Sequence, residues 1–106
     1  VRATHLRLTT AMHTVPLKRV TIVAEAVLER HLTADLERLG ARGWTVLEAR
    51  GSGSRGVRAD QVAGANVQIE TLVQPATAER IVEHVARQYF DNYAVIVYVD
   101  TVEVVR

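Results

Sequence analysis

Hydrophobic residues along this chain change their spacing in a fixed order, and that order limits the folds that the chain can adopt. Residues 18–24 (KRVTIVA) form a β-branched run, which is typical of a buried strand. The spacing then becomes helical, with leucines at steps of three and four residues: Leu28, Leu32, Leu36 and Leu39. Asp35 falls elsewhere on this helical wheel, and Gly40 and Gly43 are expected to end the helix. A second strand is expected at residues 44–49.

The rest of the chain repeats the pattern of strand, helix and strand. Residues 66–73 (NVQIETLV) alternate as a strand does, and Thr77 is the expected N-cap of a second helix. On that helix we expect His84 at the surface. Residues 93–99 (YAVIVYV) are almost wholly apolar, which predicts a strand buried on both faces. Residues 101–106 extend that strand or form a short fifth one.

The order strand, helix, strand, loop, strand, helix, strand predicts an α+β, ferredoxin-like βαββαβ fold. In this fold two helices cover one face of a four-stranded antiparallel sheet. The other face would carry apolar residues from the third and fourth strands, with no element left to cover them. An uncovered apolar face on so small a domain predicts an oligomer.

Composition excludes several classes of function. A length of 106 residues suits one domain, and a net charge of +1 gives no general attraction to nucleic acid or to an anionic membrane. The absence of cysteine excludes disulfides and thiolate metal sites, and no other cluster has metal-ligand spacing. No apolar run approaches a membrane span, so we expect a cytoplasmic protein. Residues 1–17 show no clear period and are expected to be a poorly ordered extension.

The stretch Gly43–Arg58 (GWTVLEARGSGSRGVR) is a strand that runs into glycines, serines and arginines. Glycines let backbone N–H groups converge on a ligand, and arginines bind carboxylate or phosphate through paired N–H donors. The residues of these two kinds in the loop are Gly51, Gly53, Gly56, Arg50, Arg55 and Arg58. Such a loop is either an anion-binding element or a flexible, solvated connection.

This stretch and three others resemble the PII-like signalling proteins. Within that superfamily they are most similar to the branch linked to inorganic-carbon metabolism, which includes regulators of cyanobacterial bicarbonate transport and carboxysome-associated PII-like proteins. The other three stretches are residues 18–25 (KRVTIVAE), 66–73 and 88–99 (QYFDNYAVIVYV). The pattern Gly-x-Gly-Ser-Arg-x-Val-Arg at residues 51–58 is the most specific part.

The resemblance implies a PII-like domain over residues 18–106 that forms a homotrimer and binds adenine nucleotides between subunits. Residues at about 51–65 would be the T-loop of this family, which changes order with ligand and contacts a partner. The expected partner is a bicarbonate transporter or a carboxysome-related protein. No direct insertion into the membrane is expected.

The resemblance also implies roles for single residues. It places ribose and phosphate contacts at Gly51, Ser52, Gly53 and Ser54, and the anion clamps at Arg50, Arg55 and Arg58. The adenine slot is expected to be lined by Val23, Thr45, Leu72 and Tyr93. Glu70 either bonds a ribose hydroxyl or is a plain exposed sheet residue.

Three positions depart from the nitrogen-regulatory members, which use a lysine and two arginines for the ATP triphosphate. Here the matching positions hold Ala94 and Val105, with only Arg106 left at the end of the chain. Asn66 stands where those proteins have a lysine for 2-oxoglutarate. These departures favour ADP, AMP or cyclic AMP over ATP. Bicarbonate beside Arg55 or Arg58 is the hypothesis for a second ligand.

Two rival functions use the same fold. Acylphosphatases bind phosphate between the first strand and helix, where this chain reads VAEAVLE without glycine or arginine. No catalytic constellation is recognisable, so we expect a regulatory protein and keep a small acylphosphatase-type or nucleotide-hydrolysing enzyme as the alternative. RNA-recognition motifs need aromatic residues on their central strands, and residues 66–73 have none.

Overall fold

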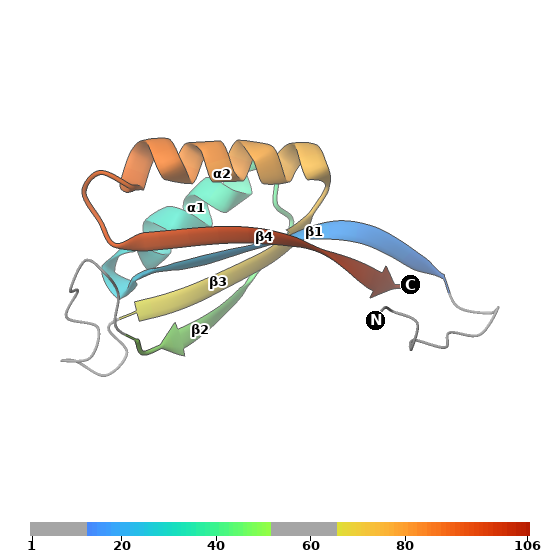
Figure 1. Ribbon diagram of the computed structural model, residues 1–106, viewed down its shortest axis with the longest axis horizontal. Helices are drawn as coiled ribbons and strands as arrows, with labels where there is room; N and C mark the ends of the chain where they lie inside the picture. Colours follow the sequence, from blue (N-terminus) through green and yellow to red (C-terminus); the bar gives the residue numbers. More distant parts are fainter. Residues whose placement is uncertain (1–12, 52–65) are drawn as a thin grey trace.

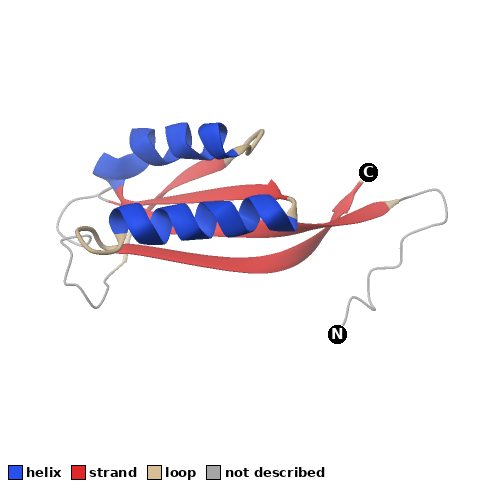
Figure 2. Ribbon diagram, turned by 90° about the horizontal axis from the view of Figure 1, so that it is seen from above, coloured by secondary structure: helices blue, strands red, loops and turns tan. Residues whose placement is uncertain are grey.

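The computed structural model describes residues 13–51 and 66–106, and in them two helices cover one face of a four-stranded sheet (Figures 1 and 2). Its elements are β1 (Thr14–Glu25), a 3-10 turn (Ala26–Leu28), α1 (Glu29–Leu39), β2 (Thr45–Ala49), β3 (Asn66–Val73), α2 (Pro75–Tyr89) and β4 (Val95–Val105). The strands lie in the order β2-β3-β1-β4, and each pair is antiparallel. The predicted ferredoxin-like α+β fold is confirmed.

The core lies between the two helices and the covered face of the sheet. Cross-strand pairing sets Ile22 of β1 beside Ile69 of β3, and these side chains are 1% and 0% exposed. The helices close the core with residues of the predicted apolar stripes: Leu28, Leu32, Leu36, Ile81 and Val85. Full burial of one such side chain stabilises the fold by roughly 1.5–3 kcal/mol, so this layer fixes the sheet against the helices.

Gly40 ends α1, as the sequence predicts. Its φ of 111° lies in the left-handed region, which residues with a Cβ rarely adopt. The next amide, that of Ala41, donates to the carbonyl of Leu36 at 2.9 Å and so satisfies one of the last helical carbonyls.

Some predicted boundaries were wrong. Thr77 does not cap α2, because that helix begins at Pro75 with Gln74 as its N-cap, which places Thr77 inside the first turn. Proline suits this position, since its φ is already helical and its missing N–H is not needed there. For residues 101–106 the first of the two predicted alternatives is confirmed, because β4 continues as one strand to Val105 and there is no fifth strand within residues 66–106.

The first strand is longer than predicted. β1 begins at Thr14, so Thr14–Leu17 belong to the sheet. These four residues pair with Val102–Val105 of β4. β3 does not reach them, because its last residue pairs with Lys18. Residues 1–12 of the expected N-terminal extension lie outside the described residues.

The prediction that the last strand is buried on both faces was wrong for the single chain. β4 lies at the edge of the sheet, and only alternate residues face the helices. Ile96 and Tyr98 point to the open face and are 58% and 50% exposed. Leu47 of β2 and Leu72 of β3 are also exposed, at 55% and 41%, on that face. The uncovered apolar face that the sequence predicts is therefore present.

Candidate functional site

Each of the four strands has one of its ends at the same end of the sheet. β2 ends at Ala49, β3 begins at Asn66, and β1 ends at Glu25, and these three residues lie side by side because Asn66 pairs with both of the others. β4 begins at the same end, where Val95 pairs with Ala24. Figure 1 shows this end on the left, at the bases of the connection between β2 and β3. We refer to it as the loop end of the sheet.

Arg50 and Gly51 lie at this loop end, directly after β2. Both residues are exposed, and Arg50 forms no ion pair with another residue of the described ranges. An exposed guanidinium without a carboxylate partner is free to bind an anion. The remaining predicted loop residues, Ser52, Gly53, Ser54, Arg55 and Arg58, lie outside the described residues, and so do their expected ligand contacts.

Tyr93 approaches the loop end from the other side, in the turn between α2 and β4. Its amide donates to the carbonyl of Tyr89 at 3.0 Å, and its ring centroid lies 6.1 Å from that of Tyr89. The amide of the next residue, Ala94, donates to Oε2 of Glu25 at 3.0 Å. The carboxylate of Glu25 therefore ties the start of β4 to the end of β1.

The other predicted adenine-slot residues lie on the open face of the sheet. Thr45 is opposite Glu70, and Leu72 is the next residue of β3 on that face. Val23 of β1 is opposite Gln68, closer to the loop end. Val23, Thr45 and Leu72 thus share one surface with Glu70 between them.

Tyr93 does not share that surface. Its side chain packs against the core together with Tyr89, on the side of the sheet that carries the helices. One chain alone therefore does not assemble a slot from Val23, Thr45, Leu72 and Tyr93. Their assignment to the adenine slot stays a prediction, to be tested in the assembled oligomer.

A buried polar cluster between the helices was missed by sequence reasoning. Asp35 of α1 is only 9% exposed, and its carboxylate accepts a hydrogen bond from the Tyr89 hydroxyl at 2.5 Å. Nε2 of His84 lies 2.9 Å from the same oxygen, and Arg38 donates to the other oxygen at 2.9 Å. His84 is therefore not a free surface residue, since 15% of its side chain is exposed.

This cluster shifts the ionisation of its members. Burial raises the pKa of Asp35, but hydrogen bonds from Tyr89, His84 and Arg38 outweigh it and hold that pKa below its ordinary value. Burial, followed by the hydrogen bond to the Asp35 carboxylate, raises the pKa of Tyr89. The cluster joins α1 to α2 and lies away from the open face, so we assign it to the stability of the fold.

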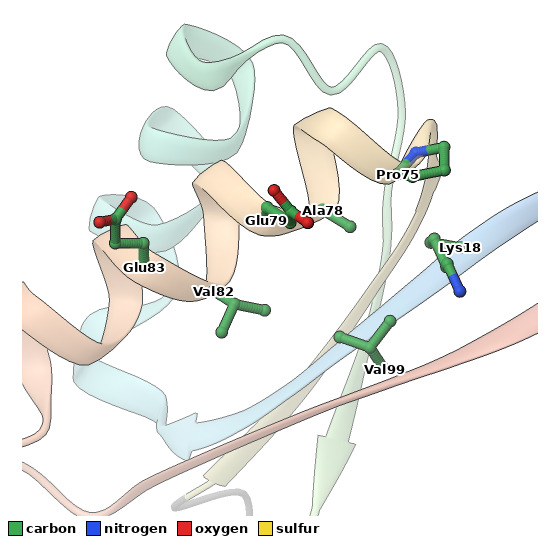
Figure 3. A pocket seen from close by; sticks show the side chains of 7 residues that line it. All are labelled: Lys18, Pro75, Ala78, Glu79, Val82, Glu83 and Val99. Atoms are coloured by element: carbon green, nitrogen blue, oxygen red, sulfur yellow. The ribbon is translucent and has the colours of Figure 1, made fainter.

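An apolar groove of about 530 Å³ runs between α2 and the β1–β4 pair (Figure 3). Its lining residues are Lys18, Pro75, Ala78, Glu79, Val82, Glu83 and Val99. None of them is a predicted ligand-binding residue. The groove is therefore separate from the loop end of the sheet.

Within residues 13–51 and 66–106 no three histidine, aspartate or glutamate side chains cluster as metal ligands. In the same ranges no helix is long and apolar enough to cross a bilayer.

Comparison with known proteins identifies the class. The model of the family described as nitrogen regulatory protein P-II matches residues 17–106. The chain belongs to this family, and it is a PII-like regulatory protein, as the sequence motifs predict. PII proteins form trimers, which agrees with the homotrimer that the resemblance implies and with the oligomer expected from the uncovered sheet face.

Solved structures support this membership. A PII-like signalling protein from Thermus thermophilus is 49% identical, with a TM-score of 0.75 over 87% of this chain and 92% of that one. CPII from Thiomonas intermedia, a nitrogen regulatory PII-like protein, is 25% identical in a structure bound to ADP, AMP and bicarbonate. That match has a TM-score of 0.74 over 86% of this chain and 97% of that one. The apo form of CPII, at 24% identity and a TM-score of 0.76, covers 90% of this chain and 98% of that one, and it supports the fold.

Proposed function

We propose that this protein is a cytoplasmic sensor of adenine nucleotides that takes ADP or AMP, with bicarbonate as a second ligand. The observation that carries the proposal is that Arg50, Gly51 and Tyr93 lie at the same end of the sheet. The similarity to CPII, whose structure is bound to ADP, AMP and bicarbonate, supports the same ligands here. Cyclic AMP is a further ligand to be tested.

The chemistry of the loop end suits a ligand with few phosphates. Arg50 at the loop end forms no ion pair with another described residue, and Ala94, the residue before β4, carries no charge. Each added phosphate brings further negative charge that such a site must balance. We therefore propose that ADP and AMP bind more tightly than ATP.

The proposed output is regulatory rather than catalytic. The connection between β2 and β3, residues 52–65, would act as the T-loop and would contact a bicarbonate transporter or a carboxysome-related protein. Binding of an anion at its base at Arg50 and Gly51 would couple the ligand to that contact, as in other order–disorder switches. The junction of β1 and α1 has the sequence EAVL at residues 25–28, without the arginine and glycine of a phosphate-cleaving loop.

Isothermal titration tests the ligand assignment. The purified protein is titrated with AMP, ADP, ATP and cyclic AMP, and the Arg50→Ala variant is titrated in parallel. We expect ADP or AMP to bind with the lowest Kd, and we expect the variant to lose several-fold in affinity while keeping the oligomeric state. Arg42→Ala is a matched control, since Arg42 is also exposed but lies between α1 and β2, away from the loop end. Equal affinity in wild type and Arg50→Ala would remove Arg50 from the site.

A further inference from the structure

We infer that Glu25 is a specificity-determining residue that disfavours nucleotides with more phosphates. The inference rests on the proposed function, because it assigns a role at the same nucleotide site. It concerns a carboxylate that the sequence patterns do not single out. What points to it is its place at the loop end of the sheet.

The position of Glu25 is fixed from two sides. It is the last residue of β1, it pairs with Asn66 of β3, and Asn66 pairs with Ala49, the residue before Arg50. On the other side its Oε2 accepts the amide of Ala94, the residue after Tyr93, at 3.0 Å. In the order of the strands, Glu25 therefore lies between Arg50, which follows β2, and Tyr93, which precedes β4.

No ion pair within the described parts of the chain neutralises the charge of Glu25. The ion pairs within residues 13–51 and 66–106 join Arg19 to Asp100, Arg38 and His84 to Asp35, and Arg87 to Glu83, and none of them includes Glu25. Its side chain is half-buried, and the hydrogen bond to Ala94 holds it in one place. Among the described residues the donor to this carboxylate is the neutral amide of Ala94, so Glu25 places a fixed negative charge beside the proposed site.

Such a carboxylate discriminates between nucleotides by charge. An extra phosphate charge about 8 Å away would weaken binding about twofold at the dielectric constant of water and about thirtyfold at the effective value near a protein surface. AMP, ADP and ATP differ in steps of about one charge, so the penalty grows along the series. Glu25 would thus favour the nucleotides with fewer phosphates without contacting the base.

The experiment compares Kd values for ADP and ATP by isothermal titration in wild type, Glu25→Gln and Glu48→Gln. Glutamine keeps the acceptor for the Ala94 amide and removes only the charge. Glu48 is the matched control, because it lies at the same end of the sheet but opposite Val67, on the other face. Glu25→Asp keeps the charge and is measured as a second variant.

We expect Glu25→Gln to raise the affinity for ATP relative to ADP by about twofold to thirtyfold. Glu48→Gln and Glu25→Asp should keep the wild-type ratio, and added salt should reduce the difference between wild type and Glu25→Gln. An unchanged ratio in Glu25→Gln, with nucleotide still bound, would refute the role of Glu25 alone. No nucleotide binding by the wild-type protein would refute the proposed function and this inference with it.

Discussion

Replacing Tyr89 by phenylalanine should destabilise the protein through one hydrogen bond, because the ring can remain packed in the core. The Tyr89 hydroxyl is a buried donor to the Asp35 carboxylate at 2.5 Å. Arg38 compensates little, since 58% of its side chain is exposed and exposed ion pairs contribute about 1 kcal/mol or less. A hydrogen bond to a charged group contributes about 1.5–3 kcal/mol, so we expect a loss of that size in the free energy of unfolding.

The assay is urea unfolding of wild type and Tyr89→Phe at one fixed protein concentration, because an oligomer's stability depends on concentration. The pH dependence gives a second readout. The pKa of Asp35 is lowered in the folded state, so its contribution is present above the ordinary pKa of an aspartate and is lost as pH falls through the lowered value. The difference between the two proteins should therefore be largest near neutral pH and should shrink in acid. A difference below about 0.5 kcal/mol at neutral pH would refute the reasoning, since changes of that size are typical of surface positions.

Three further changes probe other parts of the molecule. Gly40→Ala should cost about 1 kcal/mol or more in thermal or urea unfolding, because φ at this position is 111°, which a residue with a Cβ rarely adopts; wild-type stability would contradict the role of the left-handed cap. Ile96→Glu should convert the trimer to smaller species in light scattering, because Ile96 is 58% exposed on the open apolar face. Val27→Glu is its control, as Val27 is 71% exposed and lies in the turn after β1, and equal masses for both variants would contradict the interface assignment. Arg50→Ala should weaken binding of ADP several-fold in calorimetry without changing the mass of the oligomer; a changed mass would mean that Arg50 serves assembly instead.

Local patterns were sufficient to predict most of the fold. The leucine spacing located α1, and Gly40 ended it, because helix period and C-cap chemistry are encoded within a few residues. Asn66 and Val73 are the predicted and observed ends of β3. The N-cap of α2 was assigned wrongly to Thr77. Proline at the first helical position is also a start signal, and Pro75, two residues earlier, is where the helix begins.

Features that depend on distant contacts could not be predicted in this way. Asp35 and His84 are polar, so hydropathy placed them at the surface. In the structure the Asp35 carboxylate of α1 is hydrogen-bonded to His84 and Tyr89 of α2, a helix that is far away in the sequence. β4 has the apolar run of a fully buried strand, but a run of this kind also suits a strand at a subunit interface.

The same limit applies to the site. Arg50 was predicted from the loop chemistry, and the structure places it at the loop end of the sheet. Glu25 was seen only as part of a strand motif, because its hydrogen bond to Ala94 joins residues that are 69 positions apart. Pairing across the sheet, rather than spacing along the chain, brings these two side chains to the same end.

The most direct test of the central claim is isothermal titration of the wild-type protein with ADP, carried out with and without bicarbonate. We predict one ADP bound per subunit and a lower Kd for ADP when bicarbonate is present, because two ligands that favour the same state of one site assist each other's binding. Absence of ADP binding under both conditions would contradict the account. An ADP affinity unaffected by bicarbonate would leave a nucleotide sensor and remove the second ligand.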